Sequence, residues 1–310
     1  MEYRQLGNSG VRVSVIGLGT NQFGGKVDQT GVNQIVAGAV DLGINFIDTA
    51  DVYTRGHSEE TLGVALKGLW HRVVLATKVR STMGEGTNDE GASRYHMING
   101  VEASLRRLQS DHIDLYQVHR WDETTPIEET LRTLDVLVRS GKVRYVGASN
   151  FAAWQLARAN LLAEMRGWEP FVSVQPHYHM LERSIEQELI PYCAACKVGI
   201  LPYFPLAGGF LTGKYRRGEP APAGSRGESS AYVKRYMTDA NYDRLDKLEA
   251  WAHERSHSMG DLAHAWLLAH PQVSSVISGA TKLEQVQVNV RAAGWALTPE
   301  ELAQVNALLA

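Results

Sequence analysis

Four ionisable residues follow three short apolar runs, and their side chains could together move a proton. The residues are Asp48, Tyr53, Lys78 and His119, and the runs span residues 44–47, 73–77 and 113–118. Each run is typical of a buried strand, and the C-terminal ends of parallel barrel strands meet at one rim, where active sites are built. We therefore expect an acid, a phenol, an amine and an imidazole to meet in the active site of an enzyme.

The chemistry open to this set is protonation of a carbonyl oxygen. A free tyrosine is a poor acid because its pKa is about 10, but the ammonium of Lys78 would lower the pKa of Tyr53. Asp48 could hold Lys78 in place, so that Tyr53 serves as a general acid, while His119 donates a hydrogen bond to the carbonyl oxygen. We find no nucleophile paired with a base and no metal-ligand spacing at this rim, so a hydride must come from outside, and nicotinamide is the usual donor.

Each of these residues also has an ordinary structural interpretation when taken alone. Asp48 could cap the turn at Thr49, Tyr53 could pack in the core, Lys78 could be buried with a partner, and His119 could be a core histidine. Their joint occurrence at three successive strand ends favours function.

Eight strand-like runs alternate with amphipathic stretches, which predicts βαβ units. The runs lie at 15–18, 44–47, 73–77, 113–118, 143–147, 172–174, 199–201 and 273–277, and the helical stretches include 30–42, 58–68, 93–108 and 126–140. Eight units match a (β/α)₈ TIM barrel, and we expect residues 1–310 to form a single domain. The competing fold is a doubly wound dinucleotide-binding sheet, but only Gly17 and Gly19 fit its fingerprint in place.

The residues beyond the eight units have three expected places. Residues 1–15 predict a β-hairpin with its turn at 7–10, which would plug the barrel floor. Residues 205–236, after the seventh strand, are rich in Gly, Pro and Ser and predict a lid or binding loop. Residues 297–309 predict a last helix with Thr298 as N-cap and Pro299 at its first position.

Composition gives no sign of a nucleic-acid or membrane partner. The chain carries 31 basic and 34 acidic residues, a net charge of −3, with no long run of one sign. We see no apolar run near the ~18 residues of a membrane span and no signal core at the N-terminus, so we expect a cytoplasmic protein. Cys193 and Cys196 fall in a helical stretch, 184–197, and are interpreted as a buried structural pair, although a Cys-x-x-Cys pair can be redox active.

Four segments in order make the chain similar to the aldo-keto reductases along nearly its whole length. They are Gly43–Tyr53 (GINFIDTADVY), Ser104–Leu108 (SLRRL), Asp114–His119 (DLYQVH) and Gly141–Asn150 (GKVRYVGASN). The resemblance implies a (β/α)₈ reductase that uses a nicotinamide cofactor. It also implies that Tyr53 is the acid and that Asp48, Lys78 and His119 complete a catalytic tetrad, since all four positions match.

The resemblance further implies which residues bind the cofactor. Ser149, Asn150 and Gln175 would hold the nicotinamide carboxamide and Tyr203 would stack on its ring. The loop after the first strand and Asp48 would also touch the cofactor, and a glycine-rich segment with two basic residues would hold the pyrophosphate. These loop and segment residues are Gly19, Thr20, Asn21, Pro205, Leu206, Ala207, Gly208, Lys214 and Arg226.

Family members prefer NADP(H), and the segment after the last strand occupies the positions that bind the adenosine phosphate. Its residues are Gly279, Thr281, Lys282, Gln285 and Asn289. Many members carry an arginine where Thr281 or Gln285 stands and a glutamate where Val288 stands. Lys282 could supply the missing charge, so we expect NADP(H), with NAD(H) as the lesser alternative.

A small carbonyl compound is the expected substrate, and its contacts are expected from variable loops. The candidates are Tyr53, His119, Asn21, Met83, Trp121, Tyr232 and Tyr236. His177 and His179 flank Tyr178, and one of them could line the pocket. We do not expect a metal there, on the view that alternating residues of an extended segment point opposite ways.

Two other functions stay open at this point. One is a regulatory protein that retains the cofactor with little turnover, like the potassium-channel β subunits that this fold resembles; one tetrad position differs there, so His119 favours working chemistry. The other is a barrel isomerase or lyase that uses Tyr53 and Lys78 without hydride transfer. The sequence leaves the substrate, the stereochemistry and the oligomeric state undecided.

Overall fold

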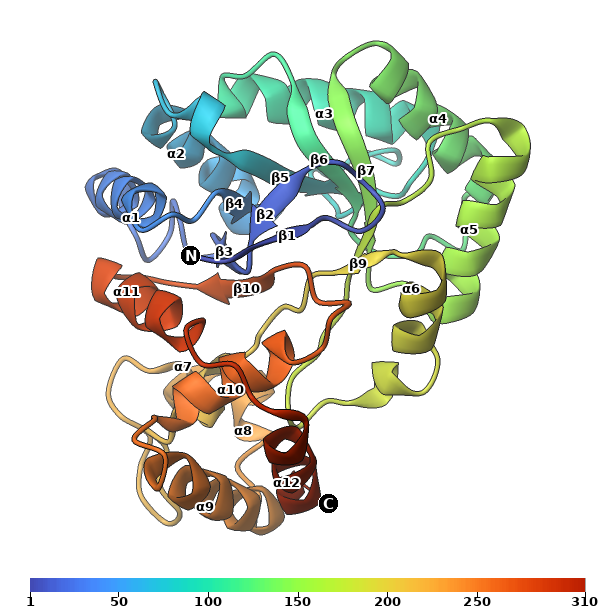
Figure 1. The fold of residues 1–310 in the computed structure, drawn as a ribbon. Helices are drawn as coiled ribbons and strands as arrows, with labels where there is room; N and C mark the ends of the chain where they lie inside the picture. Colours follow the sequence, from blue (N-terminus) through green and yellow to red (C-terminus); the bar gives the residue numbers. More distant parts are fainter. Residues whose placement is uncertain (310) are drawn as a thin grey trace.

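The centre of the molecule is a parallel β-barrel. The computed structural model describes residues 1–309 and contains an eight-stranded sheet in the order β10-β3-β4-β5-β6-β7-β8-β9, with helices around it (Figure 1). The strands are β3 (Ile16–Gly19), β4 (Phe46–Asp48), β5 (Val74–Val79), β6 (Ile113–Val118), β7 (Val143–Ser149), β8 (Ser173–Gln175), β9 (Gly199–Ile200) and β10 (Val276–Gly279).

Backbone hydrogen bonds join the two end strands of this sheet. The amide of Ile200 donates to the carbonyl of Gln272 at 2.8 Å, and the amide of Ile277 donates to the carbonyl of Pro202 at 2.9 Å. Parallel bridges pair Ile200 with Val273 and Tyr203 with Ile277. The sheet therefore closes, and the predicted (β/α)₈ barrel is confirmed.

Helices follow the strands in the alternation that the sequence predicts. They are α1 (Gln29–Asp41), α2 (His57–Ala65), α3 (Arg94–Leu108), α4 (Ile127–Arg139), α5 (Ala153–Arg166), α6 (Leu189–Cys196), α7 (Arg226–Ser229), α8 (Ala231–Lys234), α9 (Asp239–His253), α10 (Met259–Leu268), α11 (Leu283–Ala292) and α12 (Pro299–Leu309). Short 3₁₀ turns lie at η1 (Tyr53–Gly56), η2 (Trp70–Arg72), η3 (Ser184–Glu186) and η4 (Ala207–Thr212). The predicted lid after the seventh barrel strand contains η4, α7 and α8.

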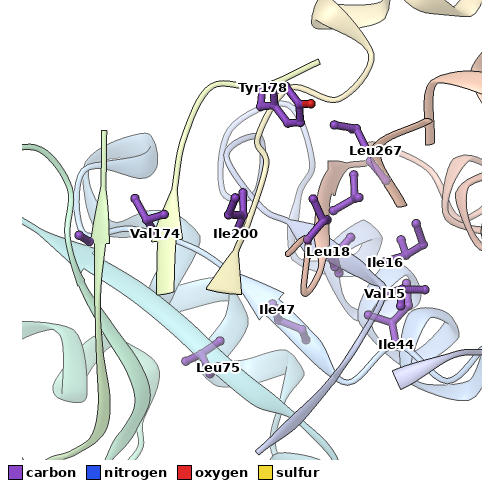
Figure 2. Close-up of a cluster of buried hydrophobic side chains, with 14 of the residues drawn as sticks. Val15, Ile16, Leu18, Ile44, Ile47, Leu75, Val174, Tyr178, Ile200 and Leu267 are labelled. Carbon is purple, nitrogen blue, oxygen red and sulfur yellow. The ribbon is translucent and has the colours of Figure 1, made fainter. Parts of the chain in front are cut away.

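Alternation along the strands divides the apolar core in two. Ile47 and Leu75 point outward and pack in the layer between strands and helices, where Val174 and Leu267 also lie (Figure 2). Phe46 belongs instead to the cluster inside the barrel, as do Leu6, Val13, Ala76, Leu115, Leu201 and Ile277. This is the period of two that a strand imposes.

The N-terminal hairpin closes the barrel floor, as predicted. Its strands β1 (Tyr3–Gln5) and β2 (Arg12–Ser14) pair antiparallel, and Leu6 and Val13 reach into the interior cluster. Arg4 ties the hairpin to the last barrel unit by donating to the carbonyls of Leu268 and Val273, each at 3.0 Å.

The expected helix over 184–197 is wrong in its extent. Helix α6 covers only Leu189–Cys196, after the separate turn η3. Pro191 lies in the first turn of α6, where its missing N–H costs no helical hydrogen bond, so the helix must begin near it. Cys193 is buried but Cys196 is exposed, and the two are therefore not the buried pair that was expected.

None of the helices within residues 1–309 combines the length and the apolar character needed to cross a bilayer.

The floor plug predicts a large effect of Leu6→Ala on stability. The side chain of Leu6 has no exposed surface, and truncating a buried leucine typically costs about 2–5 kcal/mol. The same change at Leu161, which is 59% exposed on α5, is the matched control and should cost less than about 0.5 kcal/mol. Denaturant unfolding measures both; equal effects would mean that the hairpin does not plug the barrel.

Candidate active site

Lys78 sits at the centre of a buried polar cluster at the C-terminal rim of the barrel. Its Nζ donates to Asp48 Oδ2 at 2.7 Å, to the carbonyl of Thr49 at 2.8 Å and to Tyr53 Oη at 3.2 Å. The ammonium therefore uses all three protons. Because the phenol oxygen accepts from Lys78, the hydrogen of Tyr53 is free to point elsewhere.

Burial works against the expected acidity of Tyr53. Burial raises the pKa of Tyr53 above its ordinary value, and although Lys78 lowers it, the net direction is upward. The expectation of a net lowering is therefore wrong for the protein without a ligand, because a phenolate is poorly solvated at this position. Burial also opposes the charge on Lys78, but Asp48 and Tyr53 outweigh it and raise the pKa of Lys78.

His119 stands next to the phenol as a neutral group. Its ring lies edge-on to the ring of Tyr53, with centroids 6.0 Å apart, and its Nδ1 is 3.4 Å from Ser81 Oγ. Burial lowers the pKa of His119 to about 3, and Lys78, Arg120 and Arg80 add to this effect. A neutral imidazole can donate a hydrogen bond without carrying charge.

Two glutamines complete the environment of Asp48. Gln175 Nε2 and Gln117 Nε2 both donate to Asp48 Oδ1, at 2.8 and 3.1 Å. Gln175 was expected at the site, whereas Gln117 was missed. The available signal was a polar residue near the C-terminal end of strand β6, two positions before His119.

A cleft of about 1230 Å³ opens over this cluster. Tyr53 and His119 line it, and so do all of the expected cofactor residues except Ala207, which is buried beneath the wall. Those residues are Gly19, Thr20, Asn21, Asp48, Ser149, Asn150, Gln175, Tyr203, Pro205, Leu206, Gly208, Lys214, Arg226, Gly279, Thr281, Lys282, Gln285 and Asn289.

One end of the cleft fits a flat ring with an amide. Asn150 adopts a left-handed backbone, with φ of 55°, and its side chain donates to the carbonyl of His119 and accepts from Tyr203 Oη at 2.8 Å. The ring of Tyr203 stacks on His177, with centroids 5.2 Å apart and planes 16° apart. Tyr203 also lines the cleft, so an aromatic surface supported from behind faces the space beside Tyr53.

The lid end of the cleft fits a phosphate group. Gly208 has φ of +67°, and a Cβ there would lie 2.6 Å from Val233 Cγ2, so a side chain at this position of the wall would be strained and crowded. Lys214 and Arg226 bring positive charge to the same wall, and Arg226 also donates to Asn21 Oδ1 at 3.3 Å.

Helix α11 begins at the third part of the cleft. Lys282 is its N-cap residue and forms no side-chain cap hydrogen bond, and helix starts favour anions. Gln285 Oε1 accepts from the amide of Thr281 at 2.7 Å. Lys282 and Gln285 are both exposed, so they can contact a bound phosphate.

Residues 15–310 match the family model described as the aldo/keto reductase family. The chain belongs to this family. It is 37% identical over 319 residues to a probable voltage-gated potassium channel subunit beta of Oryza sativa subsp. japonica, covering 100% of this chain and 97% of that protein. It is 35% identical over 321 residues to aldo-keto reductase YhdN of Bacillus subtilis (100% and 94%). It is 34% identical over 328 residues to versiconal hemiacetal acetate reductase of Aspergillus parasiticus (97% and 95%).

The substrate side of this aldo/keto reductase differs from the expectation at four residues. Met83, Trp121, Tyr232 and Tyr236 do not line the cleft. Trp121 packs on Phe151 and Trp154, Tyr236 is buried in the core, and Tyr232 lines a smaller neighbouring pocket. Loop residues cannot be placed from strand order alone. The wall beside His119 is formed instead by four residues that the sequence analysis missed, Arg80, Ser81, Thr82 and Arg120.

His177 and His179 lie on the same side of their segment, contrary to the expectation. Their ring centroids are 4.8 Å apart, as positions two apart on an extended chain require. His177 Nε2 is hydrogen-bonded to Tyr232 of the lid, and His179 Nε2 to Tyr236 at 3.2 Å. The residues that the structure describes contain no group of three or more His, Cys, Asp or Glu side chains placed to hold a metal.

Buried neutral histidines should make this protein less stable in acid. Burial lowers the pKa of His119 and His179 to about 3 and of His177 to about 4, and it lowers the pKa of His264 and His270. The unfolded chain therefore binds more protons below pH ~6.5. For His119 and His179 the free energy of unfolding should fall by roughly 1.4 kcal/mol per pH unit each, and the other three histidines act in the same direction. Denaturant unfolding at pH 6.5 and pH 5 measures the slope.

The carboxyl group of Asp51 opposes this dependence of the free energy of unfolding on pH. Burial raises the pKa of Asp51 to about 8, so Asp51 contributes about one proton in the other sense. His179→Gln should make the slope shallower by about one proton. His253→Gln, which removes an exposed imidazole at the end of α9, should leave it unchanged. Equal stability at the two pH values would contradict the assignment.

Proposed function

We propose that this aldo/keto reductase reduces an aldehyde or ketone to the alcohol, reversibly, with NADPH as reductant and Tyr53 as proton donor. The observation that carries the proposal is the contact of Lys78 Nζ with Tyr53 Oη at 3.2 Å, in the wall of a cleft large enough for both molecules.

The residues of the chain divide the work of the reaction. Tyr53 gives its proton to the carbonyl oxygen, and Lys78 stabilises the phenolate that remains. Neutral His119 donates a hydrogen bond to the same oxygen and fixes its direction. NADPH, when bound, would supply the hydride that the carbonyl carbon accepts.

The raised pKa of Tyr53 suits this role. A phenol that stays protonated in the free protein always has a proton to give, and the paired cation stabilises the product of the transfer. Asp48 keeps Lys78 charged, and Gln117 and Gln175 hold Asp48. The cluster is therefore organised before a substrate binds.

Ser149, Asn150 and Gln175 are the groups that would hold the carboxamide, with Tyr203 against the ring. Lys214 and Arg226 would hold the pyrophosphate at the lid. Lys282 supports NADPH over NADH because it places a cation at the start of α11, where an extra phosphate would be bound.

Replacing Tyr53 by phenylalanine tests the acid. Tyr53→Phe should keep the affinity for NADPH and lose roughly 10²–10⁴-fold in kcat, the usual contribution of general acid catalysis. Tyr95→Phe, on the exposed surface of α3, is the matched control and should keep full activity. Cofactor binding by fluorescence and turnover by nicotinamide absorbance separate the effects; loss of cofactor affinity would make Tyr53 structural.

Replacing Lys282 tests the cofactor preference. Lys282→Ala should raise KM for NADPH roughly tenfold or more, the usual value of a hydrogen bond to a charged group, and leave KM for NADH unchanged. Lys247→Ala, an exposed lysine on α9, is the control. An equal rise for both cofactors would place Lys282 outside the site of the extra phosphate.

A second candidate function comes from the relatives named as probable potassium channel β subunits. A regulatory protein of that kind would bind NADPH without appreciable turnover. Kinetics on a panel of sugar-derived, aromatic and short-chain carbonyls distinguishes the two. Tight NADPH binding with no oxidation by any member of the panel would favour the regulatory function.

A further inference from the structure

Two arginines flank His119 at the mouth of the cleft. Arg80 follows the end of β5 at Val79, and Arg120 follows His119 directly. Both line the same cleft as Tyr53 and His119. Both also act on the imidazole, since their charges help to lower the pKa of His119.

Neither side chain has an ion-pair partner among residues 1–309. Two partly buried arginines elsewhere on the barrel are paired with carboxylates: Arg107 with Glu59 at 2.7 Å and Arg183 with Glu186 at 2.9 Å. Arg80 and Arg120 form no such pair within the described residues. Arg120 is exposed, whereas Arg80 is partly buried and its Nε is buried without a hydrogen-bond partner. A desolvated donor that lacks an acceptor costs free energy.

The backbone of Arg80 adds a second cost. Its φ is 121°, a region that residues with a side chain rarely adopt and that is strained. The carbonyl of Arg80 accepts from the amide of Gly91 at 2.9 Å, which holds the loop in this form. Strain and an unmatched donor at one residue of a cleft wall indicate a position held for a ligand.

The arginines lie far from the part of the cleft that would hold the adenosine phosphate. In the ring of strands β10-β3-β4-β5-β6-β7-β8-β9, β5 and β6 are three and four places from β10. Helix α11, with Lys282, follows β10, so Arg80 and Arg120 emerge on the other side of the barrel mouth. They stand beside the residues that face the reacting carbonyl.

We propose that the substrate of this enzyme is an aldehyde or ketone that carries an anionic group, a carboxylate, sulfonate or phosphate ester, bound by Arg80 and Arg120. This inference rests on the proposed function and names its substrate class. The carbonyl carbon gains the hydride from the nicotinamide and the oxygen gains the proton of Tyr53, so the cofactor is oxidised and the alcohol forms. The anion is unchanged and serves only to hold and orient the substrate.

The test compares two aldehydes of nearly equal shape, para-carboxybenzaldehyde and the neutral para-formylbenzamide. A charge-assisted hydrogen bond is worth roughly 10- to 100-fold in binding, so the intact enzyme should favour the acid by at least about tenfold in kcat/KM. The preference should shrink at high ionic strength because salt screens exposed charges.

Variants of the two arginines test whether these side chains cause the preference for the acid over the amide. Arg80→Gln and Arg120→Gln should each reduce the acid-to-amide ratio, and the double variant should bring it close to one. Arg80→Lys, which keeps the charge, should restore part of it. Arg132→Gln on the exposed face of α4 is the control and should keep the full ratio. General damage to the fold would lower both rates and leave the ratio unchanged.

The outcomes of these experiments distinguish the anionic substrate from the reductase function on which that proposal rests. Reduction of both aldehydes at equal rates overturns the anionic substrate and leaves the reductase intact. A rise in KM for NADPH in the Arg80 or Arg120 variants overturns it too, because the arginines would then belong to the cofactor site. If neither aldehyde is reduced, calorimetric titration of each aldehyde into the intact protein with NADP⁺ provides the test. Preferential binding of the acid that is lost in the double variant supports the anion site. Equal binding of the acid and the amide contradicts it.

Discussion

The buried ion pair between Lys78 and Asp48 is the constraint that organises the whole rim. Lys78 has 0% and Asp48 2% of its side chain exposed, and an ion taken out of water costs several kcal/mol unless it is paired and hydrogen-bonded. Here every proton of the ammonium has an acceptor, and both carboxylate oxygens are held. The cluster can exist only if β4, β5, β6 and β8 keep their register.

The interior of the barrel changes from apolar to polar within one step of two residues. Phe46 is followed on the same face by Asp48, Ala76 by Lys78, and Leu115 by Gln117. The pairing of Ala76 with Leu115 and of Lys78 with Gln117 puts the change at the same height in β5 and β6, whereas Asp48 of β4 pairs with Ala76. The apolar layer below forms the core, and the polar layer above it faces the cleft. Stability and chemistry therefore occupy adjacent layers of one set of strands.

Much of this arrangement could be predicted from the sequence because it depends on local pattern. Strand β6 has the predicted bounds, Ile113–Val118, because a buried run that is too short for a typical helix is best explained as a strand. Asp48, Tyr53, Lys78 and His119 could be selected as candidates because each lies at or shortly after the C-terminal end of an apolar run. The direction in which the pKa of Tyr53 shifts was not predicted, because it depends on how completely the surrounding chain excludes water from the phenol. Gln117 was missed because the inward face of β6 is fixed only by its register with β5.

The loops were predicted least well, for a related reason. Trp121 and Met83 follow strand ends by only a few residues, yet Trp121 packs on Phe151 and Trp154. Arg80 and Arg120 take the places beside His119 instead. Where a loop side chain points is decided by its neighbours from other loops, and spacing in the sequence does not contain that information.

The floor plug has a consequence for how the chain reaches this shape during synthesis. Arg4 bonds to the carbonyl of Leu268, 264 positions away, and Ser274 Oγ bonds to the carbonyl of Gln5, 269 positions away. Contacts between such distant positions carry a large loop-closure cost and slow folding. The N-terminal hairpin is synthesised first, but its final partners in the last barrel unit are synthesised almost last. Until those partners are present, Leu6 and Val13 lack part of the apolar cluster in which they are buried, and transiently exposed apolar surface of this kind makes a folding intermediate prone to aggregation.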